Sequence, residues 1–157
     1  MKKTAKLLFL GLFLSLSGAT FATDSQTVVF KNNQSAYNGS SEFFTGDVKV
    51  LPMTDADSAN NYTTGYVTFS AGARSAWHTH PAGQTLVVIS GTCWIQTENG
   101  EKTVAQVGDI IWCPPEVKHW HGASPEGEMT HLAITGMKDG NNVTWLEKVT
   151  DEEYMSK

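Results

Sequence analysis

Short runs of β-branched and aromatic residues, separated by glycine, dominate the chain from Gly65 onward. Runs of this length between turn residues are typical of strands in a sandwich or a closed barrel. The 3.6-residue period of an amphipathic helix is absent from this region. The pattern therefore predicts an all-β fold with an antiparallel barrel over residues 62–149, whose expected strands are 66–69, 85–89, 92–96, 102–106, 109–113 and 129–134.

The segment before the barrel, residues 23–61, has a different texture. It is rich in Asn, Ser, Gly and Asp, and its only strand candidates are the short runs 27–30 and 47–51. We interpret it as an extended N-terminal arm that supplies edge strands.

Local signals also mark one turn and one helix. The pair Asn99-Gly100 tolerates the positive φ angles of a tight hairpin, so the flanking strands should pair. Near the end of the chain, Thr150 is followed three residues later by Glu153, which is the spacing of a capping box. This predicts a short C-terminal helix over residues 150–157.

The first 22 residues have the features of a cleavable signal peptide. Three lysines precede an apolar run from Leu7 to Leu16, which is followed by small residues. The run is too short to span a bilayer comfortably, so we expect a periplasmic or secreted protein with no stable membrane insertion after processing. In such a compartment Cys93 and Cys113 could form a disulfide, the alternative being two buried thiols.

Length and charge narrow the function further. A chain of 157 residues is suited to one domain. It carries a formal net charge of -5, and it has one arginine and no basic cluster in the barrel region. Because phosphate backbones would find little to neutralise them, these features exclude nucleic acid as the expected partner and favour a small organic molecule.

Histidines are concentrated in one part of the barrel sequence, and they form two alternating pairs. Residues two apart on a strand project from the same face, so each pair can direct two rings to one point. A lone histidine is usually a hydrogen-bonded core or surface residue, whereas two such pairs on different strands favour one divalent metal ion in a barrel interior. The residues are His78, His80, His119, His121 and His131, with Gln84 placed so that its amide oxygen could join them.

The spacing of these residues resembles the cupin family. In the first cupin motif a glycine, two alternating histidines, an acidic residue and a closing glycine recur at the spacing seen over residues 72–91, where Gln84 takes the acidic position. The second motif is matched from Gly108 to His119, its last metal ligand. Two positions depart from the family pattern without removing a ligand, since Glu116 replaces a glycine and Ala123 replaces an asparagine.

A narrower likeness is to the small manganese-dependent cupins that include bacterial hydroxynitrile lyases. It covers residues 43–46, 76–81, 119–122, 129–134 and 149–152, nearly the span of the mature chain. The resemblance implies a jelly-roll barrel (a double-stranded β-helix) and a homodimer or higher homo-oligomer. It also implies His131 as the general base beside a metal, whose ligands would be His78, His80, Gln84 and His119.

The donor atoms limit which metal ions are suitable, but they do not select one ion. Three neutral imidazoles and a neutral amide leave the full divalent charge on the metal, so the site should favour an anionic oxygen. Manganese, iron, nickel and zinc all suit such donors, and the resemblance favours manganese. Four protein ligands on an octahedral ion leave two positions for water or substrate, where the ion can act as a Lewis acid on oxygen.

Several neighbouring residues have more than one expected role. His121 could orient a ligand, lie outside the barrel mouth or serve as a spare ligand. Trp77 and Trp120 could line a substrate pocket or belong to the core. Arg74 and Lys118 could bind a substrate carboxylate or be solvated charges.

The orientation of His131 is also open at this point. Leu132 and Ala133 are both apolar, so the alternation along that strand does not reveal which face it buries.

Three functions fit these features. The first is a lyase that acts on a cyanohydrin-like or hydroxy-carbonyl substrate, with a metal as Lewis acid and His131 as base. The second is a metal-dependent dioxygenase, since an open site on iron or manganese can bind oxygen. The third is a periplasmic binding or sensing protein that uses the pocket without turnover.

Overall fold

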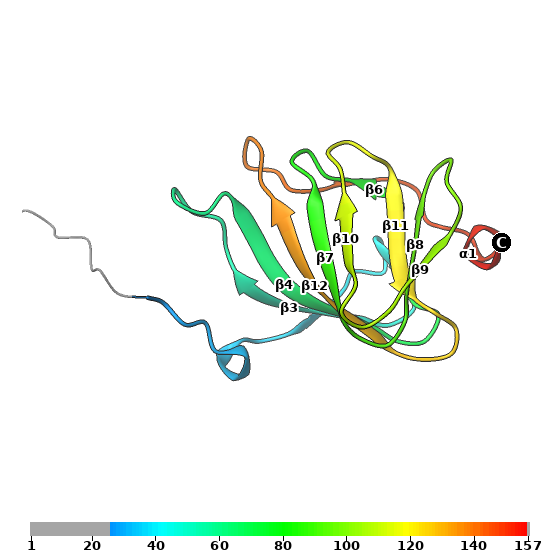
Figure 1. The fold of residues 1–157 in the computed structure, drawn as a ribbon, viewed down its shortest axis with the longest axis horizontal. Helices are drawn as coiled ribbons and strands as arrows, with labels where there is room; N and C mark the ends of the chain where they lie inside the picture. The colour runs from blue at the N-terminus through cyan, green and yellow to red at the C-terminus, as the bar shows by residue number, and fades with distance from the viewer. Residues whose placement is uncertain (1–25, 157) are drawn as a thin grey trace, which may run out of the picture.

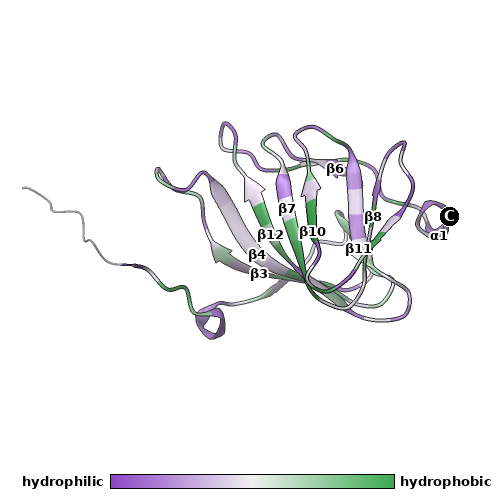
Figure 2. Ribbon diagram, viewed as in Figure 1, coloured by the Kyte–Doolittle hydropathy of each residue, from purple (hydrophilic) through white to green (hydrophobic). Residues whose placement is uncertain are grey.

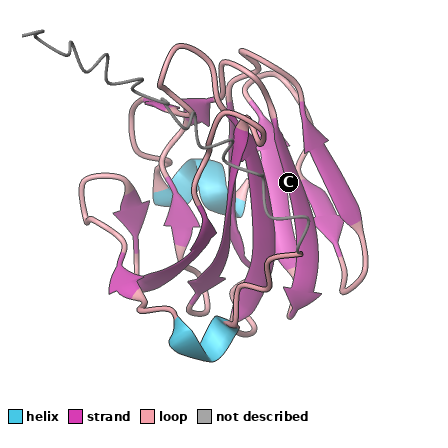
Figure 3. Cartoon of the chain, turned by 90° about the vertical axis from the view of Figure 1, so that its left-hand side faces the viewer, coloured by secondary structure: helices cyan, strands magenta, loops and turns pink. Residues whose placement is uncertain are grey.

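The structure is a computed structural model that describes residues 26–156, in which two antiparallel sheets wrap around one interior (Figures 1 and 3). The proposed signal peptide lies outside the described residues. Within the described part, no helix has the length and apolar character needed to cross a membrane. The elements are η1 (Lys31–Asn33), β1 (Tyr37–Asn38), β2 (Phe44–Thr45), β3 (Val48–Thr54), β4 (Tyr62–Phe69), β5 (Arg74–Ser75), β6 (His78–Thr79), β7 (Gln84–Ser90), β8 (Cys93–Thr97), β9 (Thr103–Ala105), β10 (Ile110–Cys113), β11 (His119–Ala123), β12 (Met129–Gly136), β13 (Thr144–Trp145) and α1 (Asp151–Met155).

One sheet has six strands in the order β1-β3-β4-β12-β7-β10, and we call it the larger sheet because its strands contain more residues than the seven short strands of the other, smaller sheet. The other has the order β13-β6-β11-β5-β2, and the hairpin β8-β9 joins it through the pairing of β8 with β11. The all-β prediction is confirmed, and each of the six strands expected in the barrel corresponds to an observed strand with shifted ends. The two-residue strands β1, β2, β5 and β13 were not predicted, because strands of this length leave no periodic pattern. The strands β6 and β11 carry the two histidine pairs that were expected on different strands.

The N-terminal segment is more closely integrated than an arm with edge strands. The run 27–30 forms no strand. In contrast, β3 overlaps the second predicted run from residue 48 onward and pairs with β1 on one side and β4 on the other. Residues 48–54 are therefore an interior strand of the larger sheet.

The predicted hairpin forms, but the turn that connects its strands is of a different type from the one expected. Strands β8 and β9 pair in antiparallel register, Cys93 opposite Ala105. Their connection spans residues 98–102, and neither Asn99 nor Gly100 has a positive φ. A longer loop thus replaces the tight turn, because five connecting residues can reverse the chain without left-handed backbone.

The C-terminal helix α1 is confirmed with its capping box. The backbone N–H of Glu153 donates to Thr150 Oγ1 over 3.1 Å, and the N–H of Thr150 donates to Glu153 Oε2 over 2.7 Å. Tyr154 is the buried residue of this helix, and its hydroxyl donates to the carbonyl of Ala123 on β11. The helix is thereby held against the smaller sheet.

Side chains inside the barrel divide into two groups along the strands. Figure 2 shows β7, β10 and β12 with hydrophobic segments towards their lower ends, whereas β11 is largely hydrophilic. We call the first group the apolar end, a packed cluster that includes Val48, Phe69, Val88, Cys93, Ala123 and Met129. The second group, the histidine end, is described below.

The two cysteines are buried free thiols, which is the second of the two expected alternatives. Burial raises the pKa of both Cys93 and Cys113 to about 12. Both are therefore protonated and poorly reactive near neutral pH.

Candidate metal centre

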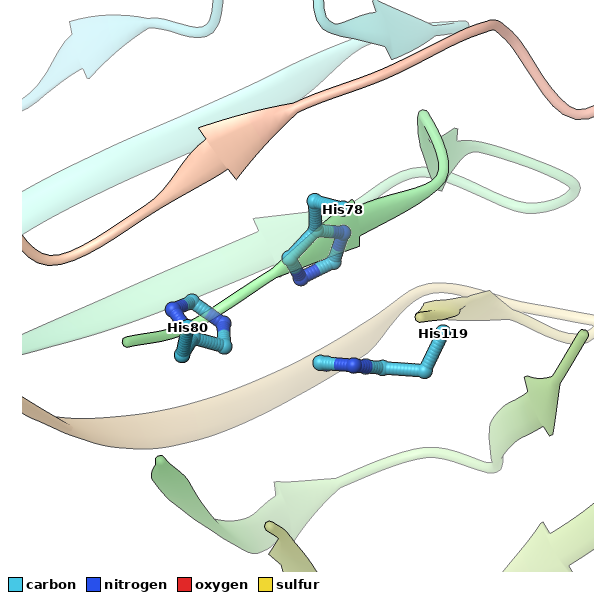
Figure 4. Close-up of side chains that lie close together, drawn as sticks. All are labelled: His78, His80 and His119. Carbon is cyan, nitrogen blue, oxygen red and sulfur yellow. The ribbon is translucent and has the colours of Figure 1, made fainter. Parts of the chain in front are cut away.

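Three buried histidines converge from two strands of the smaller sheet. His78 lies on β6, His80 follows the end of that strand, and His119 opens β11. His78 and His119 are directly opposite in the antiparallel pair β6-β11. One ring nitrogen from each of the three lies within 4.8 Å of the others, and Figure 4 shows the rings turned towards a common point. Nitrogen ligands bind an ion such as zinc at about 2.0–2.1 Å, so this cluster is close to the spacing that one ion requires.

Backbone carbonyls fix the orientation of each of these rings. Nδ1 of His78 is 2.9 Å from the carbonyl oxygen of Ala76, and Nδ1 of His119 is 2.9 Å from that of Val117. Nδ1 of His80 is 2.6 Å from the carbonyl oxygen of Asn142. A carbonyl can only accept, so Nδ1 carries the hydrogen in all three rings and Nε2 keeps its lone pair. This arrangement is characteristic of histidines that bind a metal through Nε2.

Gln84 at the start of β7 presents its amide oxygen to the same region. Its Nε2 donates to Thr135 Oγ1 over 2.9 Å, which determines which end of the amide faces inward. Among the described residues, the buried atoms that have no hydrogen-bond partner include Gln84 Oε1, His80 Nε2 and His119 Nε2. Such orphaned acceptors are costly unless something binds them, so the residues present fit a divalent cation.

The ionisation of the cluster favours metal binding as well. Burial, and then repulsion from the neighbouring histidines, holds the pKa of His78 well below its usual value. Burial lowers the pKa of His119 to about 4 and also lowers that of His80. All three rings are therefore neutral near pH 7, which is the form that coordinates a metal.

A second histidine pair lies deeper in the same interior. His131 Nε2 is 3.2 Å from His121 Nδ1, and both side chains are buried. The ring of His121 is also 5.1 Å from that of His78, so His121 lies between the proposed ligand and His131. His121 is thus neither outside the barrel mouth nor solvated.

The strand β12 settles which face His131 occupies. Its burial alternates strictly, and the inward residues are Met129, His131, Ala133 and Thr135. Leu132 therefore points to the other face, and His131 points into the barrel.

The hydrogen bond between the two rings couples their tautomers. One hydrogen lies between His131 Nε2 and His121 Nδ1, and the two outer nitrogens, His131 Nδ1 and His121 Nε2, have no partner among the described residues. If His131 donates, its Nδ1 is a free acceptor and His121 Nε2 carries a hydrogen. If His121 donates, these roles are exchanged. When both rings are neutral, the pair therefore always offers one donor and one acceptor.

The cluster opens into a cavity of about 520 Å³. His78, His80, Gln84, His121 and His131 line one part of it. The remaining lining is mostly apolar and includes Phe43, Phe44, Val50, Val67, Ala133 and Trp145. A mostly apolar cavity with a few convergent polar groups is the usual form of a small-molecule site.

Trp77 and Trp120, the expected pocket residues, do not line this cavity. They pack with Val149 and Tyr154 in a separate apolar cluster beneath α1. On β11 the histidines at 119 and 121 take the cavity face, which directs Trp120 to the opposite face. The tryptophan that does line the cavity is Trp145, which the sequence interpretation missed because β13 has only two residues.

The two flanking cations are also elsewhere. Arg74 is buried, and it donates to the carbonyl of Val149 and to Asp151, anchoring the start of α1. Lys118 forms ion pairs with Glu98 and Glu147 on the surface. Neither side chain lines the cavity, and Arg74 is not a solvated charge.

The structure explains how Glu116 can occupy the position where the second cupin motif usually has a glycine. Its φ is 60°, in the left-handed region where glycine is favoured, and its N–H donates to the carbonyl of His80 over 3.0 Å. The chain keeps the turn that a glycine usually makes here, at the cost of some backbone strain.

Fold and site together define a small β-barrel protein with a buried histidine cluster suited to a metal ion. The cupin domain family matches residues 65–135. The chain is 47% identical over 122 residues to an (R)-mandelonitrile lyase from Granulicella tundricola, covering 78% of this chain and 93% of that enzyme. The chain belongs to the cupin family and is hydroxynitrile lyase-like within it.

Solved structures agree with this assignment. A cupin-like protein from Thermotoga maritima is 41% identical and has a TM-score of 0.71, over 74% of this chain and 89% of that one. A cupin 2 conserved barrel domain protein from Rhodopseudomonas palustris has a TM-score of 0.61 at 15% identity, over 82% of this chain and 87% of that one. The second likeness shows the shared fold alone.

Proposed function

We propose that this protein is a metal-dependent lyase that breaks a carbon–carbon bond in a cyanohydrin-like or hydroxy-carbonyl substrate and releases an aldehyde. The observation that carries the proposal is the convergence of three buried histidines, with Nε2 of His80 and of His119 lacking a hydrogen-bond partner, in a chain 47% identical to an (R)-mandelonitrile lyase.

The residues that would hold the metal are His78, His80, Gln84 and His119. A divalent ion bound there would act as a Lewis acid that draws electron density from a substrate oxygen. We propose manganese as the ion, on the basis of the likeness to manganese-dependent cupins. Iron, nickel and zinc are the alternatives that the donor set admits.

His131 is the proposed general base, through Nδ1. This atom can accept a proton only when the ring carries its hydrogen on Nε2 and donates it to His121 Nδ1. His121 is therefore proposed as a positioning residue that holds His131 in the reactive tautomer. Burial lowers the pKa of His131 to about 4, so the ring is neutral and available as a base near pH 7.

The reaction on a cyanohydrin then balances as follows. The hydroxyl proton passes to His131 Nδ1, the oxygen forms a C=O double bond, and the bond to the nitrile carbon breaks with its electron pair on cyanide. Cyanide takes a proton to give hydrogen cyanide, which returns His131 to its neutral form. The products are an aldehyde and hydrogen cyanide, with no change in oxidation state.

Anaerobic turnover tests the proposal. Metal-loaded protein should convert mandelonitrile to benzaldehyde at the same rate with and without dioxygen. A rate that requires dioxygen would favour the dioxygenase, and bound substrate without conversion would favour a binding protein. His131→Ala should abolish conversion while bound metal, measured by elemental analysis, stays at the wild-type level. Unchanged conversion in this variant would overturn the role of His131.

We further propose that the protein is exported and forms a homodimer. Export rests on the signal-peptide pattern of residues 1–22 and is tested by sequencing the N-terminus of the protein in a periplasmic fraction. The homodimer is supported by the outermost strand β10, which exposes Ile110 and Trp112. Analytical ultracentrifugation that finds only monomer at micromolar concentration would contradict it.

A further inference from the structure

The ring of His80 is oriented by a different kind of contact from the other two rings of the cluster. His78 and His119 each donate to the carbonyl of the residue two positions earlier in the chain, over 2.9 Å in both cases. His80 instead donates to the carbonyl of Asn142, which is 62 residues away in the sequence. Two of the rings are therefore oriented locally, whereas the orientation of His80 depends on a distant loop.

That loop, residues 137–143, connects β12 to β13 and follows the end of β12 in Figure 1. It closes on itself, because Lys138 and Asn141 each donate their N–H to the carbonyl of the other over 2.9 Å. Asn142 then lies just before β13, which pairs with β6. The loop thus carries the chain from the larger sheet to the smaller sheet beside His80.

Two residues at the start of β4 hold this loop in place. The side-chain amide of Asn61 donates to the carbonyl of Met137 over 2.9 Å, and the N–H of Met137 donates to the carbonyl of Asn61 over 3.0 Å. At the other end of the loop, the side-chain amide of Asn142 donates to Thr63 Oγ1 over 3.2 Å. We call Asn61 and Thr63 the loop anchors. They tie both ends of the loop to one strand.

The His80 ring has few other restraints. Among the described residues, the Asn142 carbonyl is its hydrogen-bond partner, since Nε2 of this ring has none. The backbone of His80 is held separately, because its carbonyl accepts the N–H of Glu116 and that of Gly83. Loss of the Asn142 contact therefore frees the ring to rotate about its side-chain bonds while the backbone stays in place. A rotated ring no longer directs Nε2 towards the other two histidines.

We propose that the loop anchors Asn61 and Thr63 are positioning residues for His80, and that through the loop they set how tightly the metal ion is retained. The inference rests on the metal centre of the proposed function, but it is independent of the reaction catalysed there. Groups that orient a histidine ligand typically change metal affinity by about 10–100-fold when they are replaced. Asn142 and Val143 also line the cavity, so the same loop contacts both a proposed ligand and the small-molecule site.

The test measures the affinity for zinc, one of the ions that the donors admit, by competition with a chelator. Thr63→Val removes the acceptor of the Asn142 amide and keeps the shape of the side chain, so the dissociation constant should rise about 2–10-fold. The double variant Asn61→Ala/Thr63→Val should raise it about 10–100-fold. Thr64→Val is the matched control, because Thr64 also lines the cavity but bonds to Thr54 instead of the loop. Equal affinities in the wild type and the double variant would overturn the proposal.

A second measurement separates positioning from a general loss of structure. In zinc-loaded protein, NMR spectroscopy follows the exchange with solvent of the Nδ1 hydrogen in each of the three rings. In the double variant this exchange should become faster at His80 and stay unchanged at His78 and His119, whose carbonyl partners are local. Equal acceleration at all three rings would show a loosened barrel and overturn the positioning role.

Failure of the lyase proposal is distinguishable from failure of this inference. Zinc affinity and ring exchange require no substrate, so both test the loop anchors even if no cyanohydrin is cleaved. Normal zinc binding without lyase activity would overturn the lyase alone. A wild-type protein that binds no metal ion would overturn the metal centre and the role of the loop anchors together.

Discussion

The two ends of the barrel interior are built by the same strands and have opposite chemistry. On β7 the inward residues run from Gln84 to Val88, and on β11 they run from His119 to Ala123. On β12, His131 lies next in the inward row to Met129 of the apolar end. The apolar end is a packed cluster of hydrophobic side chains. The histidine end holds buried nitrogen and oxygen atoms that have no hydrogen-bond partner among the described residues.

This difference separates stability from function within one domain. Packed apolar side chains stabilise the fold because their surface is removed from water, and they offer no ligand atom to a metal ion. Buried polar atoms without partners destabilise the fold until a ligand satisfies them. The histidine end therefore depends on the apolar end to hold its strands in place, and replacements at the two ends should have opposite consequences.

The largest expected effect is the loss of the metal in His119→Ala. The variant should bind no stoichiometric metal and lose about 1000-fold or more in lyase activity, because the Lewis acid is absent. Its metal-free form should unfold with nearly the wild-type free energy, since a partnerless buried nitrogen has been removed. Elemental analysis, kinetics and urea unfolding test the three parts. Full metal occupancy in this variant would refute the site.

At the apolar end, Met129→Ala should do the reverse. Met129 is fully buried, so the cavity left behind should lower the free energy of unfolding by about 2–5 kcal/mol. Below its melting temperature the variant should still bind one metal ion. Met155→Ala is the control, because that methionine is exposed on α1 and its loss should change stability by about 0.5 kcal/mol or less.

A smaller effect is expected where the hydrogen bonding of the proposed ligands is disturbed. Thr135→Val removes the acceptor of the Gln84 amide without changing the size of the side chain. Gln84 can then rotate, and metal affinity should fall by about 10–100-fold. Competition with a chelator measures the affinity. An unchanged affinity would indicate that Gln84 is not a ligand.

The smallest effect for a single pH unit concerns the pH dependence of stability in metal-free protein. Burial lowers the pKa of His131 from 6.5 to about 4 in the folded chain, so between these values the unfolded chain binds a proton that the folded chain excludes. The stability contributed by this group is full above pH 6.5 and is lost as the pH falls towards 4. It amounts to at most about 1.4 kcal/mol per pH unit.

His131→Gln isolates this contribution. Between pH 6.5 and 4, the free energy of unfolding should fall less steeply in the variant than in the wild type. Met129→Ala should keep the wild-type slope, because the apolar end carries no group that titrates in this range. Parallel curves for His131→Gln and the wild type would show that His131 is not held neutral by burial.

The sequence was informative where a local pattern carried the physics. Two His-x-His pairs must place their rings on one face of a strand, and Thr150 with Glu153 must cap a helix, whatever the rest of the chain does. The long strands of the larger sheet were readable for the same reason. The turn at residues 98–102 was assigned the wrong geometry, because its backbone depends on how β8 and β9 pair.

The parts that escaped prediction depend on contacts between distant segments. The order of the strands, the direction of Trp120, the burial of Arg74 and the place of His131 follow from which strands lie side by side. The stacked rings of Phe43 and Trp145 are far apart in the sequence, and Trp145 lies directly opposite His78 in the β13-β6 pair. The sequence by itself determined an all-β chain with metal-binding residue types at the right spacing. Only the tertiary structure decided which rings share the interior and what surrounds them, because burial and hydrogen-bond partners are properties of packed strands rather than of neighbouring residues.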